Sequence, residues 1–193
     1  MKKVILILVA LIATVCAVSA QKLSGDITPL GKQQEVNVVL DFSGTLVNGK
    51  SEEKYIAEET GKKTESEQEQ WLEEWNVKLR NDAYHMVVKD LDKAVGAKFF
   101  YAGAFPNAEY SIVIKVKEIT TGFFAGIMAK PSSLKAEVSF VKTGNNTPIA
   151  TVEYKKVSST ASANVPYYVS RIAMSFGTLG DEIAKTISKN LKK

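Results

Sequence analysis

One segment of the chain carries residue types in a spacing that could do chemistry. Residues 44–51 fit the phosphate-binding pattern G-x-x-x-x-G-K-[ST], with Lys50 and Ser51 at its end. In such a loop the backbone N–H groups surround the phosphates, the lysine reaches the terminal phosphates and the hydroxyl binds magnesium. Three features argue against this use here: the N-terminus predicts export, no apolar strand ending in aspartate supplies a second magnesium ligand, and the strands predicted below are antiparallel. Because Asn48-Gly49 is also a common turn dipeptide, a nucleotide-binding or hydrolytic enzyme is only our third hypothesis.

The remaining side chains do not combine into a catalytic or metal-binding set. His85 is the only histidine, and Asp82 lies three residues before it, so one helix face offers two ligands and no third. Only this one histidine is available for a Ser-His-Asp triad, and the G-x-S-x-G nucleophile elbow is absent from the sequence. The carboxylates are interspersed with lysines, which is typical of a solvated face. The sequence therefore predicts a protein that is not an enzyme, with no catalytic residues, no cofactor and no metal.

The best candidate for a functional surface is an apolar segment at residues 123–128. Phe123, Phe124, Ile127 and Met128 lie there beside two glycines. Exposed side chains of this kind would present an apolar surface to a lipid, a membrane or another protein. The alternative is that the segment extends a sheet or packs under a helix, because apolar residues are most often core.

The first twenty residues resemble an export signal. Met1-Lys2-Lys3 is a basic start, residues 4–15 are an apolar run, and Val18-Ser19-Ala20 is a small-residue cleavage site. The apolar run is shorter than the ~20 residues of a membrane-spanning helix, so we predict no integral span after cleavage. A second interpretation makes Cys16 the lipid-modified first residue of a lipoprotein. Loss of Lys2 and Lys3 lowers the formal net charge from +4 to about +2, which is too balanced to indicate a nucleic-acid partner.

The elements that would position these residues follow from periodicity. Apolar and polar residues alternate over residues 110–117, 134–142 and 150–156, which predicts antiparallel strands with one buried face. Residues 35–43 predict a further strand, residues 98–105 are aromatic-rich and extended, and residues 120–133 form a loop or strand extension.

Helices are predicted from caps and apolar stripes. Ser51 begins a short helix, and Thr64 with Glu67 forms a capping box at the start of a long helix that Gly96 ends. A last helix runs from about Pro166 to Leu191, and Gly177 and Gly180 within it indicate a bend or a close contact with the sheet. Trp71 and Trp75 lie on or near the stripe of the long helix and are predicted to be core.

The sequence therefore predicts a single α+β domain over residues 35–193. Its sheet is mainly antiparallel, with about four to five strands and two long helices packed on one face. Residues 21–34 contain Gly25, Pro29 and Gly31 without periodicity, and are expected to be a leader or linker.

The order of these features resembles a known group of proteins. The signal, the strand with Asp41-Phe42-Ser43, the turn Asn48-Gly49-Lys50-Ser51-Glu52-Glu53, the tryptophan-containing helix and the final helix with Gly177-Thr178-Leu179-Gly180 together carry the resemblance. The chain is similar to small exported proteins of Bacteroides-like Gram-negative bacteria, and to envelope lipoprotein domains whose function is unknown. The resemblance implies an envelope or secreted location and transfers no active-site residues.

We therefore expect a non-enzymatic exported module, periplasmic or secreted, that binds a protein or another envelope component. The specific partner is unknown. An alternative is a carrier that holds a hydrophobic small molecule between helices and sheet, which requires a cavity of roughly 300 Å³ or more.

Overall fold

The computed structural model describes residues 22–145 and 147–191. The predicted signal peptide (residues 1–20) and Cys16 lie outside the described residues.

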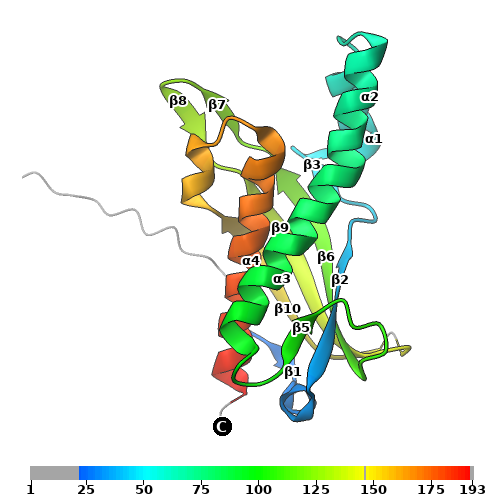
Figure 1. Ribbon diagram of the computed structural model, residues 1–193, viewed down its shortest axis with the longest axis vertical. Helices are drawn as coiled ribbons and strands as arrows, with labels where there is room; N and C mark the ends of the chain where they lie inside the picture. The colour runs from blue at the N-terminus through cyan, green and yellow to red at the C-terminus, as the bar shows by residue number, and fades with distance from the viewer. Residues whose placement is uncertain (1–21, 146, 192–193) are drawn as a thin grey trace, which may run out of the picture.

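One eight-stranded sheet forms the centre of the molecule (Figure 1). Its main path runs in the order β1-β10-β9-β6-β2-β5, with β3 and β4 attached beside β6. The strands are β1 (Ser24–Gly25), β2 (Glu35–Asp41), β3 (Leu46–Val47), β4 (Lys50–Ser51), β5 (Tyr101–Gly103), β6 (Tyr110–Thr120), β9 (Ser133–Lys142) and β10 (Pro148–Ser158). A separate two-stranded hairpin consists of β7 (Phe123–Ala125) and β8 (Met128–Lys130).

The alternating pattern of the three longest strands is confirmed. β6, β9 and β10 pair antiparallel, and Ile112, Val138 and Val152 face the same side of the sheet. These inward side chains are at most 3% exposed. A period of two places alternate side chains on one face, so the pattern correctly predicted the buried face of these strands.

The prediction of a mainly antiparallel sheet of four to five strands is wrong in part. β2 pairs in parallel with both β5 and β6, and β3 also pairs in parallel with β6, which makes the sheet mixed and larger than expected. The reason is the long helical connection after β2. It returns the chain to the end of the sheet where β2 began, so the next strands run in the same direction as β2.

Two long helices cover one face of this sheet, as predicted (Figure 1). α3 (Leu79–Val95) ends the long helix, which begins with α2 (Glu65–Glu73) and contains a π-helical segment at Glu74–Lys78. α4 (Tyr168–Asn190) is the last helix. The shorter elements are α1 (Glu52–Thr60), η1 (Thr28–Lys32) and η3 (Thr160–Asn164). The carboxylate of Glu67 accepts a hydrogen bond of 2.8 Å from the Thr64 N–H, which confirms the predicted capping box.

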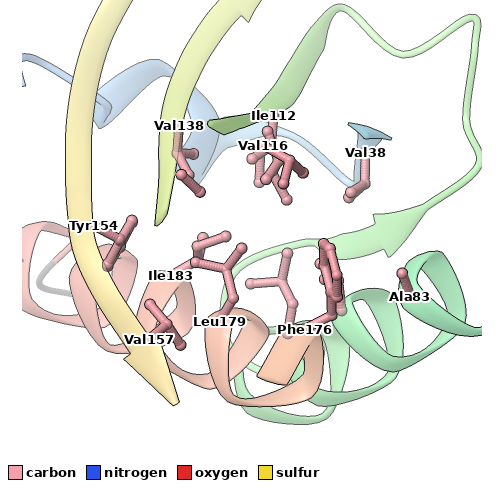
Figure 2. Close-up of a cluster of buried hydrophobic side chains, with 14 of the residues drawn as sticks. Val38, Ala83, Ile112, Val116, Val138, Tyr154, Val157, Phe176, Leu179 and Ile183 are labelled. Carbon is pink, nitrogen blue, oxygen red and sulfur yellow. The ribbon is translucent and has the colours of Figure 1, made fainter. Parts of the chain in front are cut away.

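The core lies between these helices and the sheet. Figure 2 shows Ile112, Val116 and Val138 of the sheet facing Phe176 and Leu179 of α4. All five side chains are completely buried. Side chains therefore fill the space in which a carrier would hold its ligand.

The glycines of α4 mark a contact between helices, whereas the sequence indicated a bend or a contact with the sheet. A Cβ atom at Gly180 would lie 2.5 Å from the carbonyl oxygen of Val87 in α3. One at Gly177 would lie 2.5 Å from the carboxylate of Asp90. The absence of these side chains allows α3 and α4 to pack closely together.

The segment before residue 35 belongs to the folded domain and is not a linker. β1 pairs with β10, and the side chains of Ile27 and Leu30 are 1% and 0% exposed. The short helix η1 supplies the turn that brings these two apolar residues inward. Isolated apolar residues in a 3-10 turn leave no periodic signal, which is why the sequence pattern missed them.

Candidate functional site

The hairpin of β7 and β8 projects from one end of the sheet (Figure 1). Its turn is Gly126-Ile127, and Gly126 has φ of 62°. Glycine with positive φ at the first central position is the arrangement of a type II′ turn, whose twist matches that of two antiparallel strands. A tight turn of this kind places Ile127 at the tip of the hairpin.

The four residues predicted as an interaction surface are all exposed on this hairpin. Phe123 and Phe124 are 46% and 39% exposed, Met128 is 63% exposed and Ile127 is 103% exposed. The alternative, in which the segment joins the main sheet or packs under a helix, is wrong. We call these four residues the apolar tip.

Hydrogen bonds fix the strand that leads into the hairpin. The backbone N–H of Thr121 donates to Oδ1 of Asn48 at 3.1 Å, and Nδ2 of Asn48 donates to Oγ1 of Thr121 at 3.1 Å. Gly122 follows with φ of 65°, and a Cβ atom there would collide with the carbonyl oxygen of Lys130. The hairpin therefore begins from a defined backbone geometry that requires glycine.

A buried arginine connects the base of the hairpin to α4. Arg171 is 5% exposed, and its Nε donates to the carbonyl oxygen of Thr121 at 3.0 Å. Its Nη1 donates to the carbonyl oxygens of Val165 and Pro166 at 2.7 Å and 3.0 Å. Burial lowers the pKa of the guanidinium, although arginine remains charged. The role of Arg171 was not predicted from the sequence, because its three acceptors are backbone atoms and leave no side-chain signal.

A buried group of serines holds the strand that leaves the hairpin. The hydroxyl of Ser132 donates to the carbonyl oxygen of Arg171 at 2.6 Å and lies 2.6 Å from the hydroxyl of Ser175. The backbone N–H of Ser132 donates to the hydroxyl of Ser162 at 3.1 Å. Both ends of the hairpin are thus tied to the domain. Arg171, Ser132 and their partners fix the two strand ends from which the apolar tip projects.

Three solved structures match the chain at low TM-scores and low sequence identity. The PelC dodecamer from Paraburkholderia phytofirmans matches with a TM-score of 0.44 and 10% identity, over 86% of this chain and 96% of that chain. Protein XCC0632 from Xanthomonas campestris matches with a TM-score of 0.33 and 10% identity, over 83% and 91% of the two chains. A neuraminyllactose-binding hemagglutinin homolog from Helicobacter pylori matches with a TM-score of 0.32 and 11% identity, over 88% of each chain.

No protein-family model matches the sequence, and no curated protein matches it. The resemblance to exported proteins of Bacteroides-like bacteria is not tested by these comparisons and stays a prediction.

The segment that fits the phosphate-binding pattern forms a β-hairpin. Leu46 pairs with Ser51 and Val47 with Lys50, and Asn48 and Gly49 make the turn with φ of 51° and 77°. Two central residues with positive φ are the type I′ arrangement that Asn-Gly favours. The backbone N–H groups of the segment therefore follow a strand ladder, a different geometry from the concave loop that surrounds phosphate.

The two chemical side chains of that segment have local partners. Nζ of Lys50 forms an ion pair with Glu58, which also lowers the pKa of that carboxyl group. The hydroxyl of Ser51 accepts a hydrogen bond of 3.3 Å from the N–H of Lys54 and caps α1. The neighbouring strand β2 pairs in parallel with β6, so the expectation of purely antiparallel strands around this segment is wrong. The hairpin geometry, and not strand direction, distinguishes this segment from a phosphate-binding loop.

His85 and Asp82 lie beside a shallow groove of about 200 Å³ between α3 and α4. Met86, Ala173 and Met174 supply most of its apolar lining. Within residues 22–145 and 147–191, no group of three or more His, Cys, Asp or Glu side chains is placed to hold a metal ion.

An aromatic cluster fastens α1 and α2 to the rest of the domain. The rings of Trp71 and Trp75 are stacked 5.4 Å apart, and the ring of Tyr55 lies 5.1 Å from that of Trp75. Nε1 of Trp75 donates to Glu52 at 2.6 Å, and the same carboxylate pairs with Arg80. Trp71 and Trp75 are 8% and 0% exposed, which confirms them as core.

Proposed function

We propose that this protein is an exported, non-enzymatic module of the Gram-negative envelope that binds a protein or another envelope component through the apolar tip. The observation that carries the proposal is an exposed apolar hairpin with a fixed base. Binding by a loop without secondary structure costs conformational entropy, and a hairpin with paired strands and a fixed base has less of it to lose.

The location is supported by the signal-like N-terminus of the sequence. In the part of the chain that the structure describes, no helix combines the length and the apolar character needed to cross a membrane. Binding by the apolar tip therefore concerns a surface or a partner and does not involve a spanning helix of this part of the chain.

Photo-crosslinking in the native envelope tests this proposal. Ile127 is replaced by a photoreactive benzoylphenylalanine, and the matched control carries it at Tyr101, which is 59% exposed in β5, away from the hairpin. We expect a specific adduct from position 127 and none from position 101, identified by mass spectrometry. A protein or a lipid adduct supports the proposal. Adducts at neither position, or equally at both, contradict it.

The carrier hypothesis is not favoured by the packed core. Two surface hollows of about 470 and 500 Å³ are lined mainly by polar and charged side chains such as Lys185, Glu182 and Gln33. A hydrophobic ligand would need an apolar lining, so we do not propose this function.

A further inference from the structure

A group of lysines lies at the base of the hairpin. A hollow of about 250 Å³ there is lined by four lysines and one glutamate, together with Thr120, Ser133 and Leu134. The charged residues are Lys130, Lys135, Lys155, Lys156 and Glu118. We call the three lysines 130, 155 and 156 the basic rim.

A β-bulge places two of these lysines on the same face. The register of β10 against β9 shifts between Tyr154 and Val157, and both of those side chains are completely buried. Lys155 and Lys156 between them are both exposed. Strict alternation would turn one lysine into the core, so the extra residue of the bulge directs both to solvent.

The basic rim has an excess of positive charge. Lys135 pairs with Glu118 at 2.6 Å and Lys117 pairs with Glu137 at 3.0 Å, whereas Lys130, Lys155 and Lys156 form no ion pair with any other described residue. Unpaired lysines around one hollow create a local positive potential that attracts anionic groups such as phosphate.

The apolar tip is separated along the hairpin from Lys130, the one lysine of the basic rim that belongs to β8. Residues 122–129 contain only glycine, alanine, phenylalanine, isoleucine and methionine, and Lys130 comes directly after them. Ile127 is three residues from Lys130, which corresponds to roughly 10 Å at the rise of a strand. Apolar faces of interfacial segments reach about 5–10 Å into the boundary between headgroups and acyl chains. The spacing therefore matches a lipid surface, with apolar chains below a layer of phosphates.

We infer that the hairpin inserts its apolar tip into an anionic lipid surface while the basic rim contacts the headgroup phosphates. This inference rests on the proposed function, since it names the envelope component that the tip binds. The tip is an exposed hairpin turn without a polar side chain, and the one carboxylate in the adjacent hollow, Glu118, is paired with Lys135, which leaves a positive excess. Both properties fit a bilayer better than the mixed polar rim of a protein interface.

Vesicle flotation tests the inference with purified protein. The anionic vesicles contain equal parts phosphatidylglycerol and phosphatidylethanolamine, and the reference vesicles contain phosphatidylcholine alone. We expect roughly ten-fold or stronger partitioning into the anionic vesicles, weakened by high salt, because a few lysines near an anionic surface each contribute roughly five-fold.

Two variants separate the apolar and basic contributions. Ile127→Asp and the double variant K155E/K156E should each lower partitioning roughly ten-fold or more. The matched controls Tyr101→Asp and Lys98→Glu change exposed residues elsewhere and should bind like wild type. All five side chains that change sign or polarity are exposed, so unfolding temperatures should stay close to the wild-type value.

A depth measurement provides an independent readout. In Ile127→Trp the new indole should shift its emission to shorter wavelength and be quenched by brominated acyl chains only with anionic vesicles. Trp71 and Trp75 are buried and provide a constant background.

No partitioning at low salt, or partitioning that Ile127→Asp leaves unchanged, overturns the lipid inference. If the lipid inference fails but position 127 still crosslinks to a protein in the envelope, the proposed function stands. If position 127 gives no adduct either, the proposed function fails together with the lipid inference.

Discussion

At the scale of single residues, buried polar groups are held by short local contacts. The hydroxyl of Tyr154 lies 2.8 Å from Oγ1 of Thr186 and donates to the carbonyl oxygen of Glu182 at 3.3 Å. Burial raises the pKa of Tyr154 to about 12, and burial together with the nearby Glu59 raises the pKa of Tyr55 to about 12. Both phenols are neutral in the folded protein well beyond the pH at which a free tyrosine ionises.

These shifts predict a loss of stability at high pH. An unfolded tyrosine releases its proton near pH 10, whereas folded Tyr154 holds it to about pH 12. The stabilising contribution of Tyr154 to the free energy of unfolding is therefore fully present below about pH 10 and is lost as the pH rises through 12. Between about pH 9 and 11 we expect Tyr154→Phe to lose roughly 1 kcal/mol less free energy of unfolding than wild type, measured by urea denaturation. Groups other than Tyr154 titrate in both proteins, so their effects cancel in the comparison. An equal loss of unfolding free energy in the two proteins would refute the raised pKa of Tyr154.

At the scale of elements, the closest packing is between α3 and α4. Val87 and Leu91 of α3 approach Gly180 of α4, so the helix backbones themselves are in contact. Glycine costs helix propensity, and the close contact offsets that cost.

This contact predicts that Gly180→Ala destabilises the protein although alanine favours helices. The added methyl group would lie 2.5 Å from the carbonyl oxygen of Val87, and overpacking of this kind costs about 1–3 kcal/mol. Ser188→Ala, on the exposed side of the same helix, is the matched control and should change the free energy of unfolding by less than about 0.5 kcal/mol. Chemical denaturation measures both. A Gly180→Ala variant as stable as wild type would show that α3 and α4 can shift to accommodate the methyl group without loss of free energy of unfolding.

At the scale of the whole molecule, the segment before residue 35 packs into the core together with the end of the last helix. Ile27 and Leu30 pack into the same core cluster as Leu191 at the end of α4, so the first and last described segments are held by one core. The domain therefore begins before residue 35.

We expect Leu30→Ala to destabilise the entire domain. Its side chain is completely buried, and truncating a buried leucine costs about 2–5 kcal/mol. The matched control is Lys32→Ala, which alters an exposed residue of the same turn. Thermal unfolding followed by circular dichroism should show one cooperative transition that moves to lower temperature only for Leu30→Ala. An unchanged transition would restore the interpretation of this segment as a linker.

The sequence by itself determined the local features of this protein. The buried faces of β6, β9 and β10, the capping box at Thr64 and the apolar stripe of α4 all depend on residues a few positions apart. Such features are fixed by the period of a strand or helix and by hydrogen bonds within one turn. The four residues of the apolar tip were selected in the same way, from their type and spacing.

Only the tertiary structure decided the relations between distant segments. The parallel pairing of β2 with β6, the three backbone acceptors of Arg171 and the exposure of the apolar tip each require segments far apart in the chain to meet. The bulge that turns Lys155 and Lys156 outward is likewise a property of the pairing between β10 and β9. No periodicity within one segment encodes its partner, because that choice is made by the packing of the whole core.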